Sequence, residues 1–440
     1  MPTTVKPALP ALPAPLPFGN NVPVLPGPLR ISVVTETYPP EVNGVAVTLA
    51  RTVQGLHALG HQLQLVRPRQ HTADSAAPQH RFDQVLVRSL CIPRYAQLKM
   101  GLPSRRTLLA QWRQRRPDVV HIATEGPLGW SALQAARALG VPVTSDFRTN
   151  FHAYSRHYGV GWLGKPILAY LRSFHNRTLT TMVPTQALAH TLASLGLQRL
   201  QVVGRGVDTQ RFSPDKRSGA LRASWGVAAH TLVVACVGRL APEKNLDALL
   251  AAFAAVQTAR PDSRLLLVGD GPLRAALQQA CPHAIFAGLR SGDDLAAHYA
   301  SADLFLFPST TETFGNVTPE AMASGLPVVA YAHAAAAQLI HHGHNGWLVP
   351  LDQTPLFTQQ AVAAALDPAL ARVLGRRARA TALLHGWDHI VGQVDAVLRQ
   401  AAGQPGQPAS AASRPCHHLA VPASHGDVTM AGHAEPRRNC

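Results

Sequence analysis

The stretch Thr231-Leu-Val-Val-Ala-Cys-Val-Gly-Arg-Leu-Ala-Pro-Glu-Lys244 decides the fold class of this chain. A β-rich apolar run ends at Gly238, and a helical pattern of leucine and alanine follows the short polar loop. A short, uniformly apolar run of this kind is typical of a strand buried on both faces of a parallel sheet. The stretch therefore predicts a strand, loop and helix that open an α/β domain.

The same alternation of short apolar runs and amphipathic segments continues on both sides of this stretch. Strands are predicted at 31–35, 63–65, 119–122, 141–145 and 179–183, and again at 265–268, 284–286, 304–307, 327–330 and 347–349. A helix is predicted over 45–59, where Gly60 is placed to end it. Glycines and Pro214 interrupt the pattern within 201–214, which indicates the seam between two units. We therefore expect two Rossmann-like domains in tandem, facing across a cleft at the carboxyl ends of their strands.

Composition bounds the class of protein and its partners. The chain has 440 residues, 46% of them hydrophobic, and a formal net charge of +16. This length predicts more than one domain, and the charge favours anionic partners. The five cysteines form no CxxC pair, so neither a zinc site nor a disulfide framework is predicted. We find no signal-peptide pattern and no transmembrane run, and we expect a cytoplasmic protein.

The strongest local motif is Pro308-Ser-Thr-Thr-Glu-Thr-Phe-Gly-Asn-Val-Thr-Pro-Glu320, directly after a predicted strand. Thr318 suits an N-cap and Pro319 suits the first helical position, which places Glu320 in the first turn and Glu312 in the loop. Backbone amides at the start of a helix bind anions. The residues expected to supply them are Phe314, Gly315 and Asn316. Glu320 alone could simply complement the helix dipole, but the pair of carboxylates favours a binding site.

A second motif follows the strand quoted first. Gly238 permits a close approach of the backbone, and Arg239 and Lys244 lie five residues apart at the start of a helix. Two cations beside such a backbone turn are suited to a diphosphate. The alternative is that Lys244 and its neighbour Glu243 are only solvated residues of a first helical turn. A third, weaker motif places Gly44 at the start of the first domain's helix, where a phosphate could approach.

Together these motifs resemble glycosyltransferase family 4, a nucleotide-sugar-dependent family with the GT-B fold. The resemblance runs from about residue 30 to residue 402 and is closest to bacterial GDP-mannose-dependent α-mannosyltransferases and sulfoquinovosyltransferase-like enzymes acting on lipids. The segments that carry it are Asn43–Val45, 121–127, 204–208, Gly238-Arg239, 243–245, 269–272, and Glu312 with Glu320.

The resemblance implies a retaining sugar transfer without a metal or other cofactor. Arg239 and Lys244 would hold the donor diphosphate and stabilise it as it leaves, and Glu312 would contact sugar hydroxyls. Glu320 would bind the ribose, and Gly44 would pack against the phosphate from the other domain. The remaining donor contacts would come from Gly238, from the amides of Phe314, Gly315 and Asn316, and from the backbone of the loop that contains Leu289.

The family pattern also implies the domain limits. An acceptor domain is expected over 29–205, and a nucleotide-sugar donor domain over 206–386. A C-terminal helix over 387–402 would cross back to the first domain. We predict disordered tails at 1–28, which is rich in proline, and at 403–440, which contains Cys416 and several histidines.

The chain departs from the family pattern at two places. Arg148 stands where relatives often carry a histidine, and it could touch donor phosphate or sugar, or signal another donor or acceptor. The segment 331–338 lacks the usual paired glycines and the acid that follows them. His341, His342 and His344 suggest metal ligands at first sight, but the neighbouring glycines and asparagine favour a polar turn.

The function predicted on this basis is transfer of a hexose, foremost mannose from GDP-mannose, onto a lipid-linked or glycolipid acceptor. A UDP-sugar donor, glucosyl or sulfoquinovosyl, is the alternative. The basic and partly apolar segment 94–116 could lie on an anionic membrane at the inner face of the plasma membrane, or it could be an ordinary solvated helix face. Two other readings are a non-catalytic basic protein that binds membrane or nucleic acid, and a nucleotide-sugar epimerase. The transferase reading predicts no nucleic-acid partner.

Overall fold

The computed structural model describes residues 27–39, 41, 44–70, 74, 82–92, 95–148 and 164–403. Almost all of both predicted tails, with Cys416 and its histidines, lies outside these residues. So do Asn43, Arg94 and the segment that follows Arg148.

The first domain is built on a seven-stranded sheet in the order β3-β2-β1-β6-β7-β8-β9, and every neighbouring pair is parallel. Val33 in the central strand pairs with Leu65 on one side and His121 on the other. The strands are β1 (Arg30–Val34), β2 (Gln62–Pro68), β3 (Asp83–Val87), β6 (Val119–Ile122), β7 (Val143–Asp146), β8 (Thr180–Val183) and β9 (Leu200–Val202). A separate antiparallel hairpin joins β4 (Ser89–Ile92) to β5 (Tyr95–Gly101).

Helices cover both faces of this sheet. Leu49 and Val53 of α1 belong to the core on one face, and Leu108 and Trp112 of α2 belong to the core on the other. Gly60 follows α1 with φ of 90°, a left-handed conformation that suits glycine and ends the helix as predicted. The helices are α1 (Gly44–Ala58), α2 (Arg105–Gln114), α3 (Pro127–Ala138), α5 (Gly164–His175) and α6 (Gln186–Ser194).

The second domain repeats this plan with a six-stranded parallel sheet in the order β12-β11-β10-β13-β14-β15. Alternate residues of β10 enter two separate cores: Val233 and Ala235 face one way, Val234 and Cys236 the other. This is the all-apolar strand that the first stretch predicted. The strands are β10 (Leu232–Val237), β11 (Ser263–Val268), β12 (Ile285–Gly288), β13 (Leu304–Phe307), β14 (Val328–Tyr331) and β15 (Trp347–Val349).

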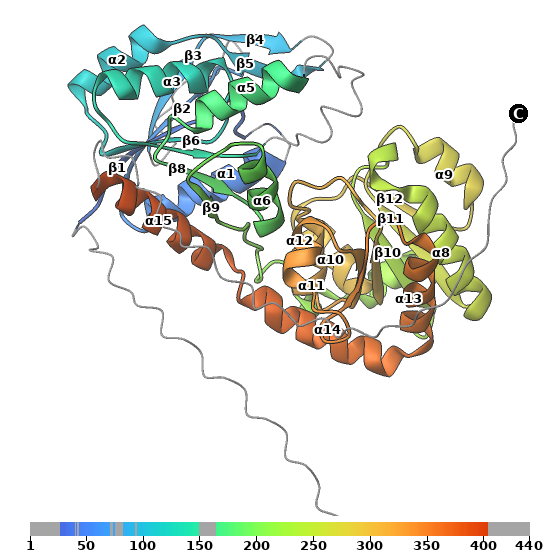
Figure 1. Cartoon of the computed structure of the whole chain (residues 1–440). Coiled ribbons are helices and arrows are strands. Elements are labelled where there is room, and N and C mark those ends of the chain that lie inside the picture. The colour runs from blue at the N-terminus through green and yellow to red at the C-terminus, as the bar shows by residue number, and fades with distance from the viewer. Residues whose placement is uncertain are drawn as a thin grey trace, which may run out of the picture. The chain divides into compact units, whose positions relative to one another are not determined.

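Ten helical segments follow or separate these strands in the described part of the second domain, and Figure 1 shows the longer ones packed around the sheet. They are η2 (Pro214–Lys216), α7 (Gly219–Ser224), η3 (Pro242–Lys244), α8 (Leu246–Ala259), α9 (Arg274–Ala280), α10 (Gly292–Ser301), α11 (Val317–Ala323), α12 (Ala334–Leu339), α13 (Thr354–Leu366) and α14 (Pro368–Leu383). Two parallel sheets covered by helices confirm the predicted α/β class.

The last helix, α15 (Trp387–Gly403), lies along the first sheet beside α1 (Figure 1). Its residues Ile390, Val391 and Val394 join the core that contains Leu49. A Cβ on Gly55 of α1 would lie only 2.4 Å from a Val391 methyl, so glycine is required where the two helices touch. Helix α15 is therefore part of the first domain's core.

Two details of the sequence-based prediction are wrong. Helix α11 begins at Val317 and its N-cap is Asn316, so Thr318 lies inside the helix rather than capping it. Gly315, with φ of 83°, turns the chain earlier than the threonine suggested. Strands β3 and β9 were not predicted, because these edge strands are only partly buried and show no continuous apolar run.

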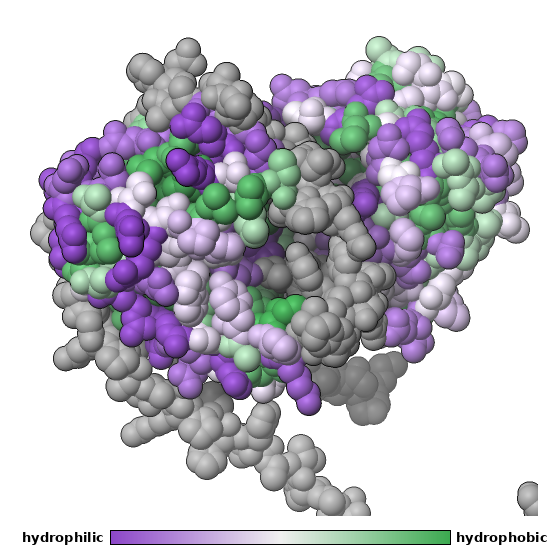
Figure 2. Space-filling view, turned by 90° about the horizontal axis from the view of Figure 1, so that it is seen from above, coloured by the Kyte–Doolittle hydropathy of each residue, from purple (hydrophilic) through white to green (hydrophobic). Residues whose placement is uncertain are grey.

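The basic segment 94–116 is not one helix as predicted, because Tyr95–Gly101 forms strand β5 and only Arg105–Gln114 forms a helix, α2. The apolar side of α2 points inward. Leu108 and Trp112 are almost fully buried, and Trp112 Nε1 donates to Gln64 Oε1 at 2.9 Å. Arg105, Arg106 and Arg113 are exposed, so any membrane contact here would depend on charge rather than on inserted apolar groups. Figure 2 shows a mostly hydrophilic face with small separate hydrophobic patches. In the described part of the chain, no helix has the length and apolar character needed to cross a membrane.

Candidate functional site

The two motifs of the second domain meet at the carboxyl edge of its sheet. Strands β10 and β13 are neighbours, so the loops that leave them lie side by side. Lys244 Nζ donates to Glu312 Oε1, and Ser309 Oγ donates to the same oxygen at 2.7 Å. Only 21% of the Lys244 side chain and 15% of the Glu312 side chain are exposed. The pair is therefore shielded enough for its charges to act strongly on a bound group.

Backbone contacts hold these two loops together. Asn245, in the left-handed conformation with φ of 54°, follows Lys244 and begins α8, and its Nδ2 donates to Pro308 O at 3.3 Å. Thr311 Oγ1 donates to Glu243 O at 2.9 Å. Lys244 Nζ also lies 6.0 Å from the centroid of the Phe307 ring. The ammonium group is thus fixed in place before any ligand arrives.

Arg239 differs from Lys244 in being available to a ligand. Its side chain is 66% exposed. Among the described residues, its one ion pair is with Glu243, at 3.5 Å. The preceding Gly238 has φ of 150°, and a Cβ on Gly269 would lie 1.9 Å from Gly238 O. Glycine at both positions lets the two loops approach each other at the strand ends.

Glu320 lies in the first turn of α11, as predicted, and is partly buried. Tyr299 Oη donates to Glu320 Oε2 at 3.0 Å. Burial raises the pKa of Glu320 to about 7, and the tyrosine hydrogen bond opposes this shift. The carboxyl group of Glu320 accepts one hydrogen bond, from Tyr299, so its other lone pairs can accept from ligand hydroxyls.

The segment between the two glutamates is held by α12. Ala335 N donates to Phe314 O at 2.7 Å, and His333 Nε2 lies 3.0 Å from Glu312 O. Asn316 Oδ1 is buried and has no hydrogen-bond partner among the described residues. A Cβ placed on Gly44 would lie 4.0 Å from Asn316 Nδ2. The glycine predicted to approach the phosphate therefore comes next to the loop that leads from Glu312 into α11.

The departure of 331–338 from the family pattern has a structural consequence. Ala334, the first residue of α12, has φ of 50°, which is a left-handed conformation. An alanine in this conformation is strained, and glycine would adopt it without strain. Ala334 nevertheless holds the turn that places the neighbouring amide of Ala335 on Phe314.

A second group of charges lies at the carboxyl edge of the first sheet. The side chain of His121 reaches Asp146 on the neighbouring strand, and its Nε2 lies 3.4 Å from Asp146 Oδ2. Arg148 Nε donates to the same carboxylate oxygen at 2.7 Å. Burial would raise the pKa of Asp146, but Arg148 and His121 outweigh it and hold the pKa well below its usual range. Arg148 therefore lies in the first domain, in an ion pair that the sequence analysis did not predict.

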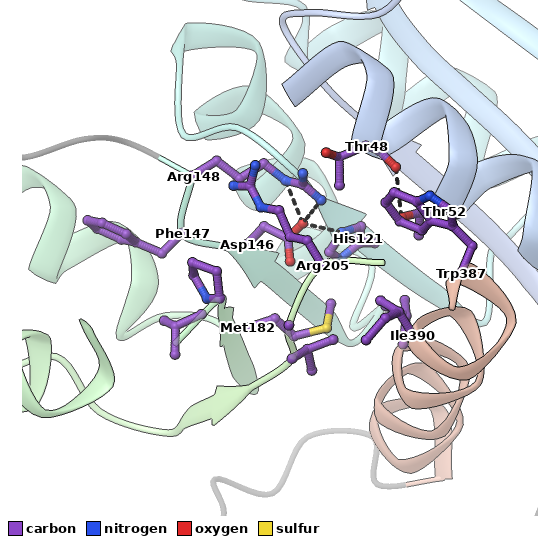
Figure 3. A pocket seen from close by; sticks show the side chains of 15 residues that line it. Thr48, Thr52, His121, Asp146, Phe147, Arg148, Met182, Arg205, Trp387 and Ile390 are labelled. Atoms are coloured by element: carbon purple, nitrogen blue, oxygen red, sulfur yellow. Dashed lines mark hydrogen bonds and ion pairs between the residues drawn. The ribbon is translucent and has the colours of Figure 1, made fainter. Parts of the chain in front are cut away.

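Arg205 joins this group from the segment after β9. Figure 3 shows Arg205 and Arg148 beside Asp146, in a cavity of about 30 Å³ that also borders Trp387 and Thr48. Burial, and then the neighbouring Arg148, lower the pKa of Arg205 to about 9. Its guanidinium carbon also lies 6.0 Å from the centroid of the Phe314 ring. Arg205 thus lies between the Asp146 group and the donor loop.

Part of Arg148 remains without a partner. Its side chain is 10% exposed, and Nη1 is buried with no hydrogen-bond partner among the described residues. Two guanidinium groups and one carboxylate leave an excess of positive charge in this cavity. An anionic group of a ligand would complete it.

The remaining predicted positions do not gather in these two groups of charged residues. Leu289 is 74% exposed in the loop after β12, so only its backbone is suited to a specific contact. His342 Nδ1 accepts from Leu348 N at 3.1 Å, which supports the polar turn. In the part of the chain that the structure describes, no three histidine, cysteine, aspartate or glutamate side chains are grouped to hold a metal ion.

Sequence reasoning missed several residues that the fold brings to these sites. Arg205 stood inside the quoted segment 204–208, and a basic residue between two glycines at the seam was a usable signal. Ser309 stood in the main motif. His121 stood in the quoted segment 121–127, but nothing there indicated its partner. Tyr299 and Asp146 carried no signal, because each reaches its partner from another strand or helix.

Comparison with protein families matches both halves of the chain. Residues 42–211 match the model described as Glycosyltransferase Family 4, and residues 231–367 match the model described as Glycosyl transferases group 1.

Individual proteins are similar over most of the chain. A GDP-mannose-dependent alpha-mannosyltransferase of Mycobacterium tuberculosis is 36% identical over 378 residues, which cover 84% of this chain and 97% of that protein. The sulfoquinovosyl transferase SQD2 of Arabidopsis thaliana is 30% identical over 329 residues, covering 72% of this chain and 62% of that protein. The solved structure of sucrose-phosphate synthase from Thermosynechococcus elongatus superposes with a TM-score of 0.69 at 20% identity, covering 84% of this chain and 98% of that one.

Proposed function

The chain belongs to glycosyltransferase family 4, with the GT-B fold and hexosyltransferase activity of that family, and we propose that it transfers mannose from GDP-mannose to a lipid-linked acceptor with retention. The observation that carries the proposal is the fixed Lys244–Glu312 pair beside the exposed Arg239 and the partly buried Glu320. The similarity to a GDP-mannose-dependent alpha-mannosyltransferase supports the choice of donor.

The proposed reaction follows from where charge develops. The bond between the anomeric carbon and the phosphate oxygen breaks, and its electron pair stays on the diphosphate. Lys244 and Arg239 are placed to stabilise that negative charge, an effect strongest in the transition state. The acceptor hydroxyl oxygen forms the new bond on the same face of the sugar, and its proton passes to the leaving phosphate.

The other residues of the loop bind and orient the donor in this proposal. Glu312 accepts hydrogen bonds from sugar hydroxyls, and Lys244 and Ser309 hold its carboxylate in position. Glu320 accepts from the ribose hydroxyls. The backbone near Gly315 and Gly44 lies next to the phosphates. These cations take the charge-neutralising role without a metal, so we expect a chelator such as EDTA to leave the rate unchanged.

The acceptor and location are proposed from surface charge. The exposed arginines of α2 would attract an anionic membrane surface. We therefore propose a peripheral protein at the inner face of the plasma membrane, with the acceptor presented from the lipid. Vesicles that carry the acceptor should support faster transfer when they also contain anionic lipid.

One observation favours a second candidate, a UDP-sugar-dependent sulfoquinovosyl transfer. Arg148 replaces the family's histidine and leaves a buried guanidinium nitrogen unpartnered among the described residues. A sulfonate on the donor sugar would satisfy it. The similarity to SQD2 agrees with this alternative.

A ligand-induced shift in melting temperature separates the two candidates. The purified protein is heated with GDP-mannose, UDP-glucose or UDP-sulfoquinovose, because a ligand that binds only the folded state raises its stability. We expect GDP-mannose to stabilise the protein, and Lys244→Ala and Glu320→Ala to abolish the shift. Lys216→Ala, at an exposed lysine of the same domain, is the matched control. Stabilisation by the UDP-sugars alone would contradict the mannose proposal, and stabilisation by none would contradict the proposed donor site.

A further inference from the structure

A large cavity lies at the amino edge of the second sheet, opposite the donor loops. Its volume is about 750 Å³, within the range of small-molecule sites. It is lined by Leu232, Asp303 and Pro327, which stand at or just before the starts of β10, β13 and β14. The donor loops leave the other ends of the same strands. The cavity is therefore separate from the proposed donor site.

The lining of this cavity is strongly positive. It contains five arginines and one acidic residue, Asp303, which gives the lining a net charge of +4 with histidine neutral. Asp303 is already shared between Arg217 and Arg222, at 2.7 and 3.0 Å. The lining arginines are Arg217, Arg260, Arg372, Arg376 and Arg379.

Three of these arginines are fixed by backbone carbonyl groups. Arg217 donates to Ala302 O at 2.8 Å, Arg260 to His230 O at 3.0 Å, and Arg379 to Thr209 O at 2.9 Å. A carbonyl oxygen satisfies a hydrogen-bond donor but does not neutralise the charge. Arg217 and Arg260 are also paired with Asp303 and Asp262, at 2.7 and 3.3 Å, whereas Arg379 has no ion pair among the described residues. These groups therefore build a rigid wall on which Arg379 carries the charge that no carboxylate neutralises.

The other two arginines are available to bind. Arg372 and Arg376 lie one turn apart on α14, and both are exposed. Neither makes a hydrogen bond or ion pair with any residue that the structure describes. Residues four apart on a helix share one face, so both guanidinium groups can reach the same ligand.

A buried hydroxyl group gives independent evidence for a ligand. Ser324 lines the cavity, is 3% exposed, and its Oγ has no hydrogen-bond partner among the described residues. Buried polar groups in folded proteins are nearly always paired, so an unpaired hydroxyl at a cavity is a contact left for a bound group. The walls beside it are apolar, as shown by Leu326, Ala364 and Ala371.

We propose that this cavity binds a phosphate-bearing ligand at a site distinct from the nucleotide-sugar site. Arg372 and Arg376 supply the charged donors, and the fixed Arg379 adds positive charge. Guanidinium groups pair bidentately with phosphate oxygens. The volume and the apolar walls leave room for an organic part of the ligand beyond the phosphate.

Binding is tested with two phosphate sources on the full-length protein. Glycerol 3-phosphate represents a free phosphate ester, and phosphatidylglycerol vesicles represent a lipid headgroup, with phosphatidylcholine vesicles as the blank. Both are measured in a Lys244→Ala background, so that phosphate binding at the donor loop does not contribute. We expect the double variant Arg372→Gln/Arg376→Gln to weaken binding by roughly tenfold or more, and added salt to weaken it in the parent.

The control is Arg377→Gln, which removes one charge from the same helix outside the cavity lining, where the double variant removes two. It should bind like the parent. Ser324→Ala should also weaken binding without lowering the melting temperature, because its hydroxyl has no partner to lose. Selective loss with glycerol 3-phosphate assigns a free phosphate ester, and selective loss with vesicles alone assigns a lipid. Equal effects of Arg377→Gln and the double variant, or no binding of either probe, would overturn the proposal.

Discussion

The two sheets present charged groups at the same edge but use them differently. In the second domain, Lys244 and Glu312 come from loops, stay partly exposed, and stand beside the open Arg239. In the first domain, Asp146 ends a buried strand and is enclosed by Arg148 and His121. The first arrangement leaves charge for a ligand, whereas the second satisfies most of its charge internally. The two domains therefore share a sheet plan but differ in whether the charged groups at this edge are open to a ligand or enclosed by one another.

The largest effect is expected from breaking the buried group of the first domain. Asp146→Asn leaves Arg148 and Arg205 without their carboxylate, and loss of one partner from a buried pair lowers the free energy of unfolding by about 3–5 kcal/mol. Urea unfolding measures the loss. Asp83→Asn, in the exposed pair with Arg115, should change it by less than about 1 kcal/mol. Similar losses in both variants would show that Asp146 is not a structural centre.

The second domain should respond in rate rather than in stability. Lys244→Ala removes a cation from the proposed leaving group, and we expect kcat to fall by about 10²–10³. Steady-state sugar transfer measures the fall in kcat. The free energy of unfolding in urea should change far less for Lys244→Ala than for Asp146→Asn. If Lys244→Ala lowered the free energy of unfolding but kept its kcat, Lys244 would be a structural residue and the contrast between the two domains would be wrong.

A pH profile tests Glu320 within the donor site. Since its pKa is about 7, kcat/KM should rise by about tenfold between about pH 6 and pH 8 as the carboxyl group ionises. Glu320→Gln should flatten this limb. Glu36→Gln is the control, because burial also raises the pKa of Glu36 to about 7 but the residue lies in the first domain. If Glu36→Gln removed the rise of kcat/KM with pH and Glu320→Gln did not, the assignment of this rise to Glu320 would be wrong.

The same titration has a defined effect on stability. Between about pH 4.5 and pH 7 the folded state keeps a proton on Glu320 that the unfolded chain has lost. The free energy of unfolding therefore falls as pH rises through this window. Glu320→Gln should reduce this slope, which urea unfolding at several pH values would show.

The smallest effect concerns the turn that supports the donor loop. Ala334→Gly should raise the free energy of unfolding by about 1 kcal/mol, because glycine adopts φ of 50° without strain. Thermal unfolding measures the change. Ala336→Gly, within the same helix but at an ordinary position, should instead destabilise the protein. Stabilisation by both variants would contradict the strain at Ala334.

Much of the fold could be predicted because it depends on local patterns. The strands at 119–122, 304–307 and 347–349 are those of the structure, since buried parallel strands are uninterrupted apolar runs. The edge strands β3 and β9 were missed, because partial exposure removes that signal. The start of α11 was predicted too late, because Thr318 and Pro319 are typical of an N-cap and a first helical position. In the structure the turn at Gly315 starts the helix earlier, at Val317.

The grouping of charged residues at the carboxyl edge of the second sheet was the predictable part of the candidate site. Lys244 and Glu312 belong to segments that directly follow strands, and Glu320 belongs to the helix that comes next. Neighbouring parallel strands bring such segments together. The sequence by itself thus determined the two-domain α/β class and the edge of the second sheet that would carry a site. These depend on periodicity and on residues close along the chain.

Only the tertiary structure decided which distant side chains became partners. Asp146 contacts His121 on the adjacent strand. Tyr299 reaches Glu320 from a different helix. Arg372 and Arg376 line a cavity together with residues that are far away in the sequence. No local pattern encodes these pairs, because they depend on strand register and helix packing. Burial also determined the pKa of Glu320, since desolvation is a property of the packed fold.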